Sequence, residues 1–143
     1  MEILLHTNGV YEMSGKRYLL DTNAVIQLFD GNPEIEGLLN QADFVAMSII
    51  TEFEYLSFDS LSQEDLSEYN AFRFCLSIYG VPPDDPIFTQ MVVTARKDYG
   101  MKLPDAIIAA TARTNDLTIL TADDHFKRLD SPWKVRFYTV STT

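Results

Sequence analysis

The chain has 143 residues, 46% of them apolar, and a net charge of −10 from 11 basic and 21 acidic side chains. This length predicts one domain, residues 1–143, which can bury a core without disulfides or a structural metal. A single cysteine excludes an internal disulfide and favours a reducing, cytoplasmic location. The absence of a long apolar run excludes a membrane partner, and the acidic balance disfavours the usual basic nucleic-acid-binding module. Because Met13 could begin a shorter chain, residues 1–15 are a candidate N-terminal extension.

The first part of the chain predicts two units in which a buried strand leads into helices. Apolar runs bounded by polar cap residues give the strands, and apolar side chains at helical spacing give the helices. Asn32-Pro33 provides a cap and a first helical residue between two short helices. The expected strands are 16–20 and 44–47, and the expected helices are 24–29, 34–40 and 48–58.

The second part of the chain begins with a helix-capping sequence at Ser62 and continues with apolar residues three and four apart. This spacing predicts that 61–79 is one long amphipathic helix or a pair of helices. Its wide apolar stripe marks it as a candidate interface for a second copy or another protein. The remaining predictions are helices at 86–99 and 106–115, strands at 117–120 and 135–140, and a turn or short helix at 121–129.

Strands that alternate with helices predict an α/β fold with a parallel sheet covered on both faces. Acidic residues follow three of these strands, and Asp105 adds an acid at a helix start. Each one alone is also explained as a helix cap that complements the helix dipole. As a set, however, they are expected to meet beyond the carboxyl ends of the strands, where their repulsion calls for a cation. Clustered oxygen ligands suit Mg²⁺ or Mn²⁺.

Four segments of the chain resemble, in order and spacing, the four motifs of the PIN-domain family, and within it the VapC-type toxins of toxin–antitoxin pairs. The motifs are Leu19–Asn23, Ser48–Glu54, Leu103–Ala112 and Leu120–Phe126. The resemblance implies a three-layer α/β/α sandwich with a central parallel sheet. It further implies a Mg²⁺- or Mn²⁺-dependent endoribonuclease acting on single-stranded or loop RNA, a homodimer, and inhibition by a cognate antitoxin that binds with the second copy around 61–79.

The resemblance assigns the catalytic carboxylates to Asp21, Glu54, Asp105 and Asp123, and the metal to Asp21, Asp105 and Asp123. On a helix Glu52 and Glu54 lie about 200° apart, so only one can face the site. The family's spacing from Thr51 selects Glu54, which leaves Glu52 as a solvated charge. Hydroxyl and amide side chains are expected to hold the carboxylates or metal-bound water, although capping explains them equally well. These supporting residues are Thr22, Asn23, Thr51 and Thr121.

His125 lies beside the last acidic motif, but the resemblance gives it no role, and a surface histidine is expected rather than a general base. Two alternatives stay within the family: a stand-alone RNA-processing nuclease and a non-catalytic domain that binds RNA or a partner. Occupation of all four acidic positions disfavours the non-catalytic one. A phosphoryl-receiver signalling domain is a remote alternative, because Asp21 is followed by Thr22-Asn23 rather than by the acids that a receiver would require.

Overall fold

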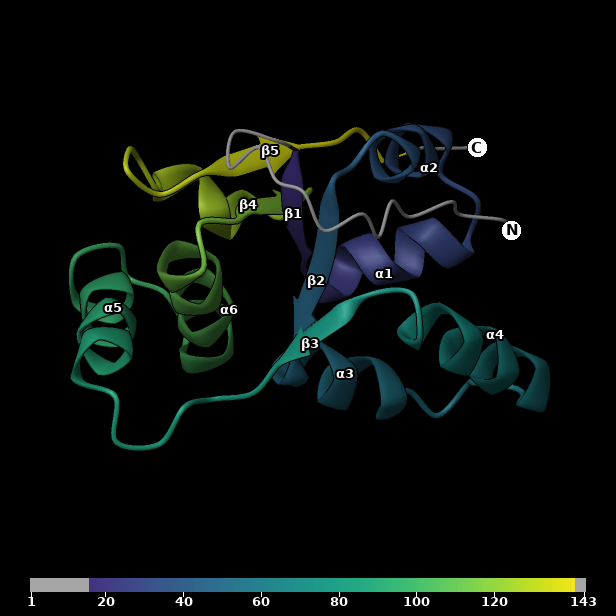
Figure 1. Cartoon of the computed structure of the whole chain (residues 1–143), viewed down its shortest axis with the longest axis horizontal. Coiled ribbons are helices and arrows are strands. Elements are labelled where there is room, and N and C mark those ends of the chain that lie inside the picture. Colours follow the sequence, from purple (N-terminus) through teal and green to yellow (C-terminus); the bar gives the residue numbers. More distant parts are fainter. Residues whose placement is uncertain (1–15, 141–143) are drawn as a thin grey trace.

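The computed structural model describes residues 16–140, so the candidate extension at 1–15 lies outside the described residues. A sheet of five parallel strands forms its centre, in the order β3-β2-β1-β4-β5 (Figure 1). The strands are β1 (Arg17–Leu20), β2 (Phe44–Ser48), β3 (Ser77–Tyr79), β4 (Thr118–Thr121) and β5 (Val135–Phe137).

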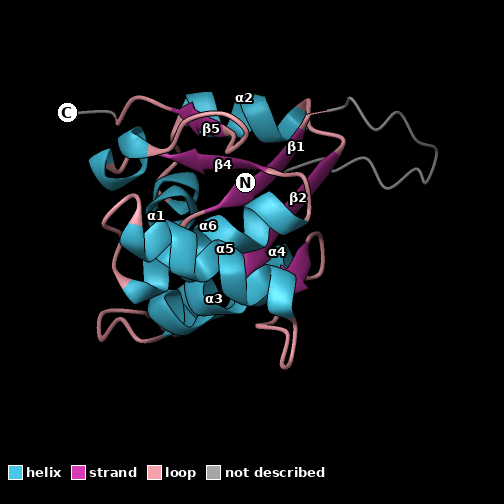
Figure 2. Cartoon of the chain, turned by 90° about the vertical axis from the view of Figure 1, so that its left-hand side faces the viewer, coloured by secondary structure: helices cyan, strands magenta, loops and turns pink. Residues whose placement is uncertain are grey.

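Helices cover both faces of the sheet, so the predicted three-layer α/β/α sandwich is confirmed (Figures 1 and 2). The helices are α1 (Thr22–Phe29), α2 (Pro33–Asn40), α3 (Ile49–Leu56), α4 (Gln63–Arg73), α5 (Pro86–Lys97) and α6 (Leu103–Thr114), with a 3₁₀ helix, η1 (Asp124–Arg128). Within residues 16–140, none of these helices is long and apolar enough to cross a bilayer.

Alternation of side chains along the strands divides the core in two. On β1, Leu20 belongs to the apolar cluster under α1, α2 and α4, whereas Leu19 belongs to the cluster under α5 and α6. Met47 and Ala46 of β2 divide in the same way. This follows from the two-residue period of a strand whose two faces are both covered.

The prediction that 61–79 is wholly helical was wrong. Ser62 and Asp65 form the predicted capping box, but α4 ends at Arg73 and the chain continues as the edge strand β3. Pairing of Ile78 with Met47 of β2 holds this strand in the sheet. The sheet edge thus overrides a local pattern that suits a helix, which is the usual outcome when tertiary pairing opposes propensity.

The prediction that Glu52 is a solvated charge was also wrong. Its side chain is buried, with only 8% of the residue exposed, because α4 packs across α3. One carboxylate oxygen accepts hydrogen bonds from Arg73 Nε at 2.5 Å and from the Tyr69 hydroxyl at 3.0 Å. The Arg73 guanidinium, helped by Tyr69, lowers the pKa of Glu52 below its usual value. Glu52 therefore joins α3 to α4, and Glu54 occupies the other side of α3.

The strand order places a topological switch point between β1 and β4. From β1 the chain moves outward to β2 and β3, and then crosses back to β4 on the other side of β1. At such a point the connections leave in opposite directions and open a crevice beyond the carboxyl ends of the strands. Asp21 follows β1 directly, and Asp123 follows β4 after one intervening residue.

Replacement of Glu52 tests its role as a structural link. We expect Glu52→Gln to lower the free energy of unfolding by about 1 kcal/mol, or roughly 3 °C in melting temperature, because Arg73 loses its charge partner while remaining half-exposed to water. Thermal unfolding followed by circular dichroism measures the shift. The matched control is Glu64→Gln, an exposed carboxylate on α4, and an equal loss in both variants would contradict the assignment.

Candidate active site

Asp21 is the most buried carboxylate of the site, with 4% of the residue exposed. It is the N-cap of α1, and its Oδ1 accepts a hydrogen bond from the backbone N–H of Ala24 at 2.8 Å. The Thr121 hydroxyl, at the end of β4, donates to its other oxygen. Both oxygens are thus fixed by backbone and side chain at the junction of β1 and β4.

Asp123 is held beside Asp21 through the same threonine. Its backbone N–H donates to Thr121 Oγ1 at 2.9 Å, and its carboxylate accepts from the backbone N–H of His125 at 2.9 Å as the N-cap of η1. The neighbouring Asp124 is exposed and pairs with Lys127 at 2.8 Å. The structure therefore places Asp123, rather than Asp124, in the crevice, in agreement with the predicted spacing.

Asp105 and Glu54 reach the crevice from two helices. Asp105 lies in the first turn of α6, after Pro104, and is half-buried. Glu54 is exposed on α3 and accepts a hydrogen bond from the Thr22 hydroxyl at 2.6 Å. Segments far apart in the sequence thus bring the four predicted carboxylates to one cleft.

Two of the four predicted supporting residues contact carboxylates, Thr121 with Asp21 and Thr22 with Glu54. Thr51 is fully buried and donates to the Leu20 carbonyl at 3.5 Å, so it contacts the backbone of β1 instead. Asn23 is exposed at the cleft.

The cleft around these groups has a volume of about 580 Å³. Four carboxylates and two exposed phenylalanines are among its walls, while the described residues lining it include no lysine or arginine. The lining residues are Asp21, Thr22, Asn23, Phe53, Glu54, Ser57, Phe58, Asp105, Ile108 and Asp123.

Burial and mutual repulsion raise the pKa values of two of the acids. The pKa of Asp21 rises from 3.8 to about 6, chiefly because burial disfavours its charged form. The charges of Asp123 and Asp105 act in the same direction, against the hydrogen bonds from Thr121 and Ala24. The pKa of Asp105 is also raised, mainly by burial and then by the charge of Asp123. The cleft therefore holds more negative charge than its own walls neutralise.

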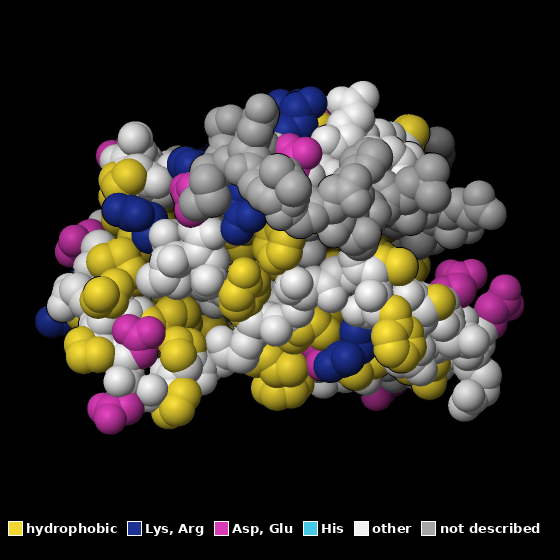
Figure 3. Space-filling view, viewed as in Figure 1, with side chains coloured by type: hydrophobic (Ala, Val, Ile, Leu, Met, Phe, Trp, Pro, Cys, Tyr) yellow, Lys and Arg dark blue, Asp and Glu magenta, His cyan; other side chains and the backbone are white. Residues whose placement is uncertain are grey.

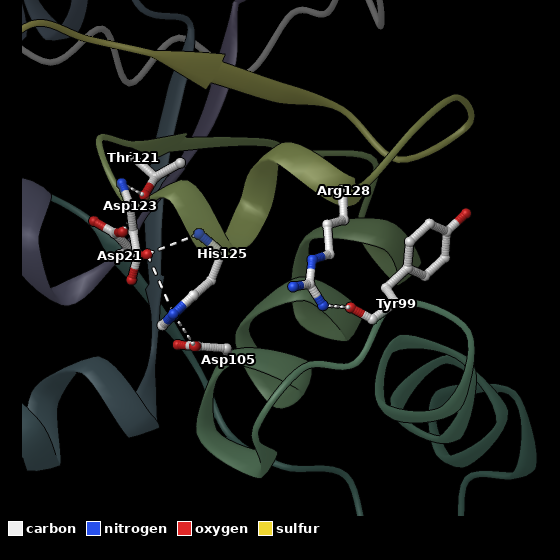
Figure 4. Close-up of polar contacts among 7 residues, drawn as sticks. All are labelled: Asp21, Tyr99, Asp105, Thr121, Asp123, His125 and Arg128. Atoms are coloured by element: carbon white, nitrogen blue, oxygen red, sulfur yellow. Dashed lines mark hydrogen bonds and ion pairs between the residues drawn. The ribbon is translucent and has the colours of Figure 1, made fainter.

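His125 is the residue of the site that the sequence did not identify. Its side chain is exposed, as expected of a surface histidine, yet its Nδ1 lies 3.3 Å from Asp123 Oδ1 and 3.6 Å from Asp105 Oδ2. Figure 4 shows the imidazole between the two carboxylates, while Arg128 on the same 3₁₀ helix turns away toward the Tyr99 carbonyl. The one signal in the sequence is that His125 stands two residues after a capping acid.

The donor set fits a divalent cation. One ligand atom from each of Asp105, Asp123 and His125 can be chosen so that all lie within 4.8 Å of one another. Hard carboxylate oxygens that repel each other in a partly buried cleft are stabilised by a cation of charge two, which would also favour the ionised form of Asp21.

The comparisons with known proteins identify the family. The profile of the PIN domain matches residues 18–132, most of the chain, and the chain therefore belongs to the PIN-domain family. PIN domains are nucleases. No curated protein sequence matches the chain significantly.

Solved structures with the same fold include proteins of toxin–antitoxin systems. A toxin–antitoxin complex from Klebsiella pneumoniae aligns with a TM-score of 0.68 and 26% identity, covering 88% of this chain and 99% of that chain. VapBC2 from Rickettsia felis, bound to a promoter DNA fragment, gives a TM-score of 0.69 and 20% identity, covering 85% and 98%. VapBC-1 from nontypeable Haemophilus influenzae gives 0.67 and 21%, covering 84% and 96%. The latter two similarities establish the fold.

The raised pKa of Asp21 predicts a pH-dependent stability that its amide variant lacks. Without metal, the stability that Asp21 contributes is fully present below about pH 4 and is lost as pH rises through about 6, because the folded state binds the proton more tightly than the unfolded chain. Asp21→Asn should therefore become more stable relative to wild type by about 2 kcal/mol between pH 4 and 7.

Urea unfolding in EDTA at several pH values measures this difference. Asp59→Asn, at an exposed carboxylate after α3, is the control and should follow the wild type at every pH. A difference between Asp21→Asn and wild type that stays constant from pH 4 to 7 would refute the raised pKa.

Proposed function

We propose that the protein is a metal-dependent endoribonuclease and the toxin of a toxin–antitoxin pair. The observation that carries the proposal is the convergence of Asp21, Glu54, Asp105 and Asp123 on one cleft of a PIN domain. Carboxylates alone would repel a phosphodiester, but together they can hold a divalent cation that neutralises its negative charge. Mg²⁺ or Mn²⁺ bound by Asp21, Asp105 and Asp123 would polarise the scissile phosphate and lower the pKa of a bound water.

The chain's own residues then have distinct tasks. Asp105 and Asp123 offer oxygens at the cleft, while the more buried Asp21, fixed by Thr121 and Ala24, adds a third carboxylate. Glu54, which the Thr22 hydroxyl orients, lines the same cleft and would act as a general base toward a water there. Three of the acids are attached at element ends and Glu54 within α3, so the fold holds this arrangement ready before substrate binds.

We propose RNA as the substrate because the four motifs resemble those of VapC-type toxins. The open cleft suits a single-stranded or loop segment, whose phosphates can enter without a surrounding duplex. The net charge of −10 opposes RNA, so binding must depend on local basic groups. Lys127 and Arg128 are exposed on the same short helix as His125, and RNA binding would require Lys127 to leave Asp124 and Arg128 to leave the Tyr99 carbonyl.

An antitoxin partner is supported by the structural neighbours, which include a toxin–antitoxin complex from Klebsiella pneumoniae and VapBC structures from Rickettsia felis and Haemophilus influenzae. The cleft contains uncompensated carboxylates, which suits a partner that inserts a basic side chain. We propose that the antitoxin and a second copy of the chain bind the surface around α3, α4 and β3. We also propose that the protein acts in the cytoplasm. Figure 3 shows hydrophobic side chains along these elements.

The apolar stripe of 61–79 is only partly available for such contacts. Tyr69 and Phe72 are buried inside the chain, Tyr69 stacked on Tyr55 with ring centroids 5.0 Å apart. Phe74, just after α4, is 91% exposed, and Phe53 of α3 is 58% exposed. These two phenylalanines offer more apolar surface for a partner than the stripe itself does.

The catalytic assignment predicts a sharp contrast between neighbouring glutamates. Asp105→Asn and Glu54→Gln should reduce cleavage of single-stranded RNA by roughly a hundredfold or more, because each removes a charge from the cleft. Glu52→Gln, assayed well below its melting temperature, should cleave at the wild-type rate, since Glu52 faces α4 and not the cleft. Initial rates on a labelled oligonucleotide with Mg²⁺ or Mn²⁺ measure the effect, and EDTA should abolish it.

EDTA-resistant cleavage by the pure protein would overturn metal dependence. A loss of cleavage in Glu52→Gln with retention in Glu54→Gln would reverse the assignment on α3. Correctly folded protein that binds but never cuts RNA would favour the non-catalytic alternative.

The toxin assignment predicts growth arrest and a specific antagonist. Expression of the wild type should stop growth, Asp105→Asn should not, and co-expression of the adjacent gene product should restore growth and suppress cleavage. Sedimentation of the free protein at micromolar concentration should show a dimer, which Phe74→Asp should weaken by placing a charge on the exposed apolar surface. An active nuclease without growth arrest or antagonist would instead favour the stand-alone RNA-processing enzyme.

A further inference from the structure

The cluster at the acidic cleft contains a nitrogen donor as well as carboxylates. Two of its three members, Asp105 and Asp123, provide oxygens, and the third, His125, provides the Nδ1 of an imidazole. An all-oxygen set is what Mg²⁺ prefers, whereas imidazole nitrogen favours first-row transition metals. The presence of a histidine therefore bears on which ion the site selects.

The two distances from His125 to the carboxylates suit ligands of one ion. Atoms that share an ion at about 2.1 Å lie roughly 3 to 3.5 Å from one another. His125 Nδ1 lies 3.3 Å from Asp123 Oδ1 and 3.6 Å from Asp105 Oδ2, close to this range. Figure 4 shows the imidazole directed toward both carboxylates.

The backbone holds His125 in this position. Asp123 Oδ1 accepts the backbone N–H of His125, so the carboxylate and the imidazole are joined by one short turn. Phe126, the next residue, is 1% exposed within the core under α5 and α6, which anchors η1 to the domain. The imidazole therefore needs only small side-chain adjustments to coordinate an ion, and none of the backbone.

We infer that His125 is a direct ligand of the active-site metal and makes this site select Mn²⁺ over Mg²⁺. The inference rests on the proposed function as a metal-dependent nuclease. Of the two ions named there, Mg²⁺ and Mn²⁺, it selects Mn²⁺. The nitrogen adds affinity for a transition-metal ion that a magnesium ion does not gain, while the two carboxylates retain the oxygen ligands that manganese also accepts.

Electron paramagnetic resonance of Mn²⁺ bound to the tag-free full chain tests the inference without reference to activity. Titration of the free Mn²⁺ signal gives the affinity, and electron spin-echo modulation of the bound ion reports nitrogen in its coordination sphere. We expect ¹⁴N modulation in the wild type that disappears in His125→Gln, together with a loss of Mn²⁺ affinity of about tenfold or more. Competition with Mg²⁺ should show that Mg²⁺ affinity changes by less than about twofold.

The chain offers a matched control, since its only other histidine is His6. His6→Gln should keep both the modulation and the Mn²⁺ affinity. His125 is exposed, so its variant should melt close to the wild type, which separates loss of a ligand from loss of the fold.

The outcomes distinguish the inference from the function it rests on. Tight Mn²⁺ binding without ¹⁴N modulation, or with modulation that persists in His125→Gln, would overturn the inference and leave a metal-dependent nuclease with oxygen ligands only. Failure of the wild type to bind either Mn²⁺ or Mg²⁺ at millimolar concentration would overturn the inference and the proposed function together.

Discussion

The repulsion between carboxylates at the end of a parallel sheet is the constraint on which the rest of this structure depends. Asp21 is buried at the junction of β1 and β4, and Asp105 and Asp123 add charge beside it. Burial and repulsion both oppose ionisation, so the metal-free fold loses stability as Asp21 ionises between about pH 4 and 7. The hydrogen bonds from Thr121 and Ala24 favour the ionised form of Asp21 and so offset part of the effect of burial. They also hold the carboxylate at the cleft, where a cation can bind it.

The division of labour on α3 follows from this constraint. A helix that contributes Glu54 to the cleft must itself be held against the domain, and Glu52 does this by accepting from Arg73 and Tyr69 of α4. Two glutamates of the same short motif thus have different roles. Glu52 pairs with Arg73 inside the protein, and the Glu54 carboxylate lines the cleft. Because residues 52 and 54 point to opposite sides of α3, the structural glutamate and the glutamate of the cleft are kept apart.

Most of the fold could be predicted from the sequence because it depends on local pattern, whereas the four acidic positions were assigned by resemblance to the PIN-domain motifs. Strand alternation, cap residues such as Ser62, and acids placed after strands can each be recognised without tertiary information. The errors occurred where distant contacts decide the outcome. Glu52 is buried only because α4 returns across α3, β3 forms only because the edge of β2 is open, and His125 reaches Asp105 only through the packing of η1 on α6.

Thr121 has a consequence for the placement of Asp21 and Asp123 relative to each other. Its single oxygen donates to Asp21 and accepts from the backbone N–H of Asp123, so one atom is the common reference point for both acids. Two hydrogen bonds to one atom therefore fix the Asp21 carboxylate and the backbone of Asp123 relative to each other, and the His125 N–H then orients the Asp123 carboxylate. At this last residue of β4, serine would keep the hydroxyl that both hydrogen bonds share. Valine, which has nearly the same shape as threonine, would remove both hydrogen bonds.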